Sequence, residues 1–66
     1  MLEAFEKLVL WLEESGLWHQ VVHLVQHVGL HAFKEFVKEY GAHIWHIIKD
    51  YAADIFGLLT DFLSPA

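Results

Sequence analysis

Histidines are the most conspicuous chemically capable side chains of this 66-residue chain, which contains six of them together with nine carboxylates. Four recur at every fourth position: His19, His23, His27 and His31. Residues four apart are neighbours on one face of an α-helix, so adjacent imidazoles of this series can reach one Zn²⁺ or Cu²⁺ ion. A zinc site takes three protein ligands when it is catalytic and four when it is structural. We therefore expect any such site to need ligands from another helix or another chain.

A second group of potential ligands lies further along the chain. His43, His46, Asp50 and Asp54 are spaced i, i+3, i+7 and i+11, which places them on one side of a helix. The metal hypothesis, with Zn²⁺ or Cu²⁺ as the ion, takes five histidines as its candidate ligands: His19, His23, His27, His43 and His46. The alternative interpretation is that both groups are solvated polar faces with no bound ion.

Residues for covalent catalysis and for most cofactors are missing. The chain has no cysteine, which excludes disulfides and thiolate metal sites. Ser15 and Ser64 fall where helices are expected to end, and no glycine-rich phosphate loop follows a strand. Haem held inside a bundle needs histidines that point into the apolar interior, whereas His19, His23 and His27 lie opposite the apolar face of their helix. We therefore expect a non-enzymatic protein with no cofactor beyond a possible metal ion.

Helices are the elements that must position these side chains, because apolar residues recur with a helical period along the chain. Ser15-Gly16, Gly29 and Gly41 interrupt this pattern. At Gly29 the apolar stripe turns by roughly 100°, so one straight helix cannot bury both parts. Ser64-Pro65 ends the last helix, since proline disfavours helical geometry in the residue before it. The predicted helices, of which the last is the longest, cover residues 2–14, 17–28, 30–40 and 42–63.

The expected fold is therefore all-α, a compact bundle of four short amphipathic helices with glycine corners, in a single domain over residues 1–66. Each predicted helix has an apolar arc of about half its circumference or more, wider than the roughly 100° needed against one core. In the first helix even the polar half carries an apolar residue, Leu10. A chain this short buries only about 60% of its unfolded surface, so we expect apolar surface to remain exposed.

Surplus apolar surface is typical of a partner-binding face, a self-association face or a membrane contact. Our leading hypothesis is a helical association module that forms a homo-oligomer or docks a partner through these faces. Aromatic residues are the most effective anchors of such contacts. The candidate anchors on the apolar arcs are Trp11, Trp18, Phe33, Phe36, Trp45 and Phe56.

The charge balance excludes one class of partner. Four lysines, no arginine and nine acids give a net charge of −5 with neutral histidines. Because duplex DNA carries one negative charge per ~1.7 Å, no nucleic acid is expected to bind. The same sign opposes docking on anionic lipid at neutral pH. Histidine titrates near pH 6.5, and adding six protons to a net charge of −5 gives +1, so the sign of the charge depends on pH.

Binding to a membrane surface is the main alternative to protein association. Tryptophan settles at lipid interfaces, and the helices are amphipathic. The segment 38–42 (Lys-Glu-Tyr-Gly-Ala) followed by Trp45, in a chain of short cysteine-free helices that turn at glycines, resembles the leaderless and circular bacteriocins of saposin-like fold. This resemblance implies a membrane-active protein. Those bacteriocins are strongly cationic, whereas this chain has a net charge of −5. Membrane activity of this chain would therefore require acid, which protonates the histidines on the polar face formed by His19, Gln20, His23, Gln26 and His27.

Two features distinguish the chain from an idealised design. Such designs fill exposed helix faces with glutamate and lysine and keep glycine out of helix interiors. This chain has six histidines but only four lysines, and Gly57 lies inside a predicted helix. If the chain is nevertheless designed, its histidines indicate metal binding or a response to pH as the purpose.

Overall fold

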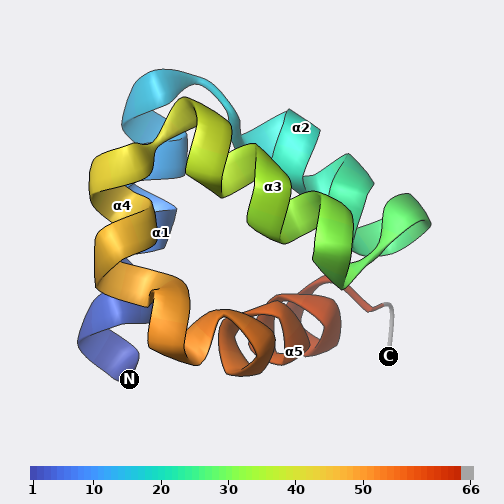
Figure 1. Ribbon diagram of the computed structural model, residues 1–66. Helices are drawn as coiled ribbons and strands as arrows, with labels where there is room; N and C mark the ends of the chain where they lie inside the picture. The colour runs from blue at the N-terminus through green and yellow to red at the C-terminus, as the bar shows by residue number, and fades with distance from the viewer. Residues whose placement is uncertain (65–66) are drawn as a thin grey trace.

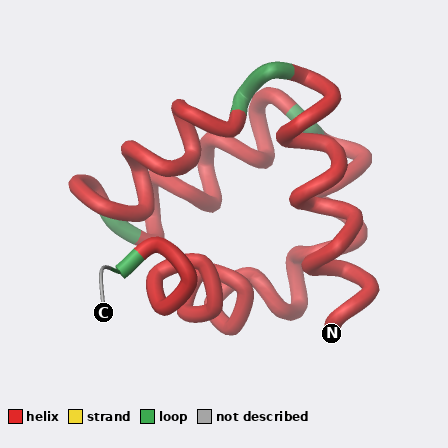
Figure 2. The backbone as a smooth tube through the Cα atoms, turned by 180° about the vertical axis from the view of Figure 1, so that it is seen from behind, coloured by secondary structure: helices red, strands yellow, loops and turns green. Residues whose placement is uncertain are grey.

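The computed structural model describes residues 1–64, and within them it contains helices and no strand. The elements in chain order are α1 (Leu2–Ser15), α2 (Trp18–His23), the π-helical η1 (Leu24–Val28), α3 (Leu30–Tyr40), α4 (Ala42–Ile48), the 3₁₀-helical η2 (Lys49–Tyr51) and α5 (Ala52–Leu63). Because η1 continues α2 and η2 joins α4 to α5, these elements form four helical segments (Figure 1). The prediction of an all-α bundle of four short helices is confirmed. Figure 2 shows that only short loops separate the segments.

The corner after α1 is fixed by a left-handed glycine. Gly16 has φ 76°, a conformation that glycine adopts without steric cost. Its N–H donates to the Glu13 carbonyl oxygen (3.4 Å), and the N–H of Leu17 donates to the Leu12 carbonyl oxygen (3.0 Å). These two bonds form a Schellman motif, which satisfies carbonyl groups left free at a helix end. The helix includes Ser15, one residue more than predicted.

The corner at Gly29 also depends on a backbone conformation that is essentially restricted to glycine. Gly29 has φ 139° and ψ −177°. Its N–H donates to the Leu24 carbonyl oxygen (2.9 Å), an i→i−5 bond that closes the π-helical turn η1. Its own carbonyl oxygen accepts the N–H of Phe33 (3.1 Å) at the start of α3. The predicted corner is therefore present, and it ends one helix and begins the next.

The corner at Gly41 depends on space rather than on backbone freedom. Gly41 has a negative φ of −143° and is buried against the Trp11 indole. A Cβ atom added at this position would lie 2.5 Å from Cζ2 of Trp11. The same indole meets the His43 ring edge-on, with ring centroids 6.4 Å apart. Trp11 thus packs into a notch at the α3–α4 corner that only glycine leaves open.

The last helical segment is bent, although its pattern predicts one continuous helix over residues 42–63. The chain turns sharply at η2, between α4 and α5 (Figure 1). A straight helix of this length would measure about 33 Å, whereas the molecule extends over 32 × 22 × 21 Å. The bend allows α4 to pack against α1 and α3, while α5 packs against α3 and η1.

The core is made of apolar side chains from all four segments. No polar or charged side chain is buried in the part of the chain that the structure describes. Phe33 of α3 is completely buried and packs against Phe56 of α5, with ring centroids 5.7 Å apart. The other large side chains that are completely buried are Leu8, Leu12, Val21, Val37, Ile48, Ile55 and Leu59. The helix ends at Leu63, and the predicted stop at Pro65 lies outside the described residues.

Candidate functional site

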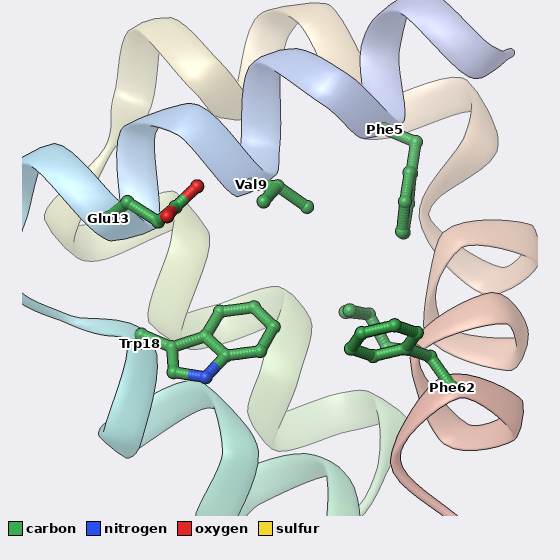
Figure 3. Close-up of a pocket in the computed structure, with 6 residues that line it drawn as sticks. Phe5, Val9, Glu13, Trp18 and Phe62 are labelled. Carbon is green, nitrogen blue, oxygen red and sulfur yellow. The ribbon is translucent and has the colours of Figure 1, made fainter.

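An apolar groove of about 490 Å³ opens between α1, α2 and α5 (Figure 3). Phe5, Val9 and Glu13 form one wall, because residues four apart project from the same face of α1. The Trp18 indole and the Phe62 ring lie across from this wall. Leu59 also lines the hollow, and Glu13 is the only charged residue of its lining. The volume is within the range of small-molecule pockets.

Large apolar side chains project from the surface around this groove. The exposed fractions are 72% for Phe62, 69% for Leu2 and 55% for Leu10. Leu10 lines a second, shallower hollow that shares three α1 residues with the groove. Leu2 belongs to the same side of α1, three residues before Phe5. We define the groove face as the partly or fully exposed apolar lining of the groove, formed by Phe5, Val9, Trp18 and Phe62. Leu10 projects beside this face, beyond Glu6 and Glu13.

Carboxylates border the groove face on α1. Glu13 lies at one end of the groove (Figure 3). Glu6 and Glu13 both line the neighbouring hollow. Neither hollow has a lysine in its lining. Both glutamates are exposed, so water solvates their charges. The groove face therefore combines apolar walls with an acidic margin.

The groove face takes in only one of the six predicted aromatic anchors, Trp18. Phe33 is completely buried in the core and offers no surface to a partner, so we no longer assign it to an interface. Phe56 packs against Phe33, and Trp11 fills the notch beside Gly41. The sequence pattern did not single out Phe5, the other aromatic residue on α1. It did indicate that this helix exposes apolar surface, because Leu10 lies on its polar half.

The remaining two predicted anchors lie on α3 and α4, where neighbouring side chains partly cover them. The Phe36 and Tyr40 rings pack together on α3, with centroids 4.8 Å apart. The ammonium group of Lys38 lies 5.4 Å from the centroid of the Trp45 ring, in a cation–π contact. Lys38 also pairs with Glu35 on the solvent side (3.2 Å). Trp45 therefore lies under Lys38, whereas Phe36 packs against Tyr40 and also lines a shallow hollow together with side chains of α2 and η1.

One pair of the predicted histidine ligands lies close together. His23, the last residue of α2, and His27, in η1, have ring centroids 5.2 Å apart and ring planes inclined by 40°. The corner at Gly29 separates His31 from this pair and places it on α3. No group of three or more histidine, aspartate or glutamate side chains in residues 1–64 is arranged to hold a metal ion. The other predicted ligands, His19 of α2 and His43 and His46 of α4, therefore do not join His23 and His27 in a metal site with three or more ligands.

The geometry of these surfaces is the basis for assigning a function. No family model matches the chain, and no curated protein or solved structure is significantly similar to it. None of the helices in residues 1–64 combines the length and the apolar composition needed to cross a bilayer. The groove face and the His23–His27 pair are therefore the two candidate sites in the described part of the chain.

Proposed function

We propose that the protein is a non-enzymatic helical association module whose groove face binds a second copy of the same chain. The groove itself supports this proposal most directly, since it combines a hollow of about 490 Å³ with exposed apolar side chains beside it. Single exposed apolar residues are normal on protein surfaces, but continuous apolar patches are typical of binding sites. Trp18, Phe5 and Phe62 supply the aromatic anchors that such interfaces favour.

Shape complementarity favours a second copy as the occupant. A two-fold dimer brings the same patch of both copies together, so the patch must offer both projections and a hollow. Phe62 of the groove face and Leu10 beside it project next to the hollow, and each copy can place these side chains against the groove of the other. An interface of standard size buries about 800 Å² per partner, roughly a fifth of the 4296 Å² surface of this chain.

The charge distribution is compatible with this arrangement. Glu6 and Glu13 are exposed at the margin of the groove face rather than in its middle. In a two-fold dimer such carboxylates remain at the rim, where water and salt screen the repulsion between like charges. Self-association should therefore become tighter, or stay unchanged, when Glu13 is replaced by glutamine. A basic partner that needs this carboxylate would instead bind the Glu13→Gln variant more weakly.

Sedimentation equilibrium at pH 7.5 and tens of micromolar protein tests the proposal. We expect a dimer, and we expect Phe62→Glu to weaken it at least tenfold because a charge would have to be buried in the interface. Phe62 is already 72% exposed, so the monomer should keep its helical circular dichroism. Tyr40→Glu is the matched control, since Tyr40 of α3 is 59% exposed and lies outside the groove face. A monomer, or equal effects of both variants, would contradict self-association.

Dye release from lipid vesicles at pH 7.5 and pH 5.0 separates this proposal from membrane activity. Self-association predicts no leakage at either pH. Leakage that is lost in Phe62→Glu and kept in Tyr40→Glu would assign the groove face to a membrane instead. Measurement at both pH values is needed because adding six protons would take the net charge from −5 to +1.

A further inference from the structure

His23 and His27 lie one helical turn apart at the junction between α2 and the π-helical turn η1. Both residues are exposed, so a hydrated ion can approach them from solvent. Neither imidazole makes a hydrogen bond or an ion pair with another group in residues 1–64. The pair therefore has ring nitrogens available as ligands.

The separation of the two rings fits a shared metal ion. Zinc binds histidine nitrogen at about 2.0–2.1 Å and prefers tetrahedral angles between its ligands. An ion held in this way by one nitrogen of each ring places the two ring centroids about 5 Å apart. The observed separation is 5.2 Å. The centroids of the two imidazoles are therefore separated by the distance that a shared ion requires.

The surroundings of the pair do not oppose a cation. Residues 17–28, which contain both histidines, include no lysine or arginine. A shallow hollow beside His23 is lined by His19, Gln20, Leu24 and Phe36, so its walls are polar or apolar and carry no ammonium group. An ion at the pair would have its remaining coordination positions open to water.

From these observations we infer that His23 and His27 form a two-histidine chelating site for a late first-row divalent metal. Imidazole nitrogen suits Cu²⁺, Ni²⁺ and Zn²⁺, and affinity for such ligands rises from Ni²⁺ to Cu²⁺ and is lower for Zn²⁺ than for Cu²⁺. Mg²⁺ prefers oxygen ligands and should not bind. This site is separate from the groove face, because neither histidine lines the groove. It therefore holds whether or not the chain self-associates.

Thermal unfolding at pH 7.5, followed by circular dichroism at a fixed protein concentration, tests the site. Because the unfolded chain does not hold the two imidazoles together, the metal should raise the melting temperature by about 4 °C or more at concentrations well above its Kd. We expect this rise with CuCl₂, NiCl₂ and ZnCl₂, largest with CuCl₂ and reversed by a chelator. MgCl₂ should have no effect. Equal melting temperatures with and without the transition metals would overturn the inference.

Single substitutions assign the ligands. His23→Gln and His27→Gln should each abolish most of the metal-dependent rise, because one imidazole alone does not chelate. His46→Gln is the matched control: this histidine of α4 is also exposed, and its replacement should leave the rise unchanged. His19→Gln should likewise leave it unchanged. If His19→Gln abolished the rise while His27→Gln did not, the chelating pair would be His19 and His23, and our assignment would be wrong.

Discussion

Trp11 and Trp18 are both half-buried at the edge of the core, but they lie in opposite surroundings. Trp11 packs into the notch left by Gly41, so the apolar surface on this side of α1 is covered within the chain. Trp18 lines the groove, where α1 and α5 leave a hollow between them (Figure 3). We call these the closed side and the open side of α1. The contrast shows that a broad apolar helix face can be covered by a local notch or left available to a partner.

Two local features produce this difference. On the closed side, the missing Cβ atom of Gly41 lets the indole approach the backbone at the α3–α4 corner. On the open side, the bend at η2 directs α5 towards α3 and η1, and α5 packs less closely against α1 than α4 does. Surplus apolar surface therefore follows from how the helices are connected, as well as from their composition.

The largest expected effect comes from removing each indole in turn. Trp11→Ala should lower the free energy of unfolding by about 3 kcal/mol, because it empties a closely packed notch. Trp18→Ala should lower it by only about 1 kcal/mol, since one side of this indole already faces a hollow. Urea titrations followed by far-ultraviolet circular dichroism, at concentrations where the chain is monomeric, measure both losses. Equal losses would mean that the two sides do not differ in packing.

Gly41→Ala should have the next largest effect. The added methyl group would collide with the Trp11 indole, and overpacking of this kind lowers the free energy of unfolding by about 1–3 kcal/mol. Gly57→Ala is the matched control, because Gly57 lies inside α5 with no atom within 4 Å of an added Cβ. It should instead stabilise the protein by about 0.5–1 kcal/mol. The same urea titrations measure both changes.

A double variant identifies the cause of the Gly41 effect. If the collision with Trp11 is responsible, Gly41→Ala should destabilise the Trp11→Ala protein much less than it destabilises the original chain. Full additivity of the two losses would show that Gly41 is needed for another reason, such as the backbone conformation of the corner.

The smallest effect is expected on the open side. Val9→Leu adds one methylene group to the wall of the groove, where space for it exists. The free energy of unfolding should change by less than about 0.5 kcal/mol, compared with the 1–3 kcal/mol typical of overpacked sites. A loss of more than about 1 kcal/mol in the monomer would show that neighbouring side chains close the groove in solution.

The helical period and the glycines were sufficient to predict most of the fold. The corners at Gly16, Gly29 and Gly41 were located because each interrupts an apolar stripe or changes its direction. The bend at η2 was not predicted, since residues 49–51 include neither glycine nor proline and the apolar stripe continues through them. This bend results from the compact packing of the whole chain, which a helical wheel does not describe.

The candidate sites were less predictable, because they depend on the spacing between helices. The histidine series was recognised from its spacing of four residues. A helical wheel treats every pair of neighbours in this series as equivalent. In the structure, however, the ring centroids of His23 and His27 lie 5.2 Å apart, and His31 lies beyond the corner at Gly29. The groove combines residues of α1 and α5 whose sequence separation hides their proximity. Trp18 was singled out as an aromatic residue on an apolar arc, and the same criterion also selected Phe33, which is buried.

The apolar interior has a consequence for behaviour in acid. All six histidines and all nine carboxylates lie on the outside, and no polar side chain in residues 1–64 is enclosed. Acidification therefore adds protons to the exterior and leaves the apolar core unchanged, and among the ring contacts between helices only that of His43 with Trp11 includes a protonatable group. Because the protonatable groups lie outside the core, a change of net charge from −5 to +1, which six added protons would give, alters the surface and leaves the buried apolar side chains as they are.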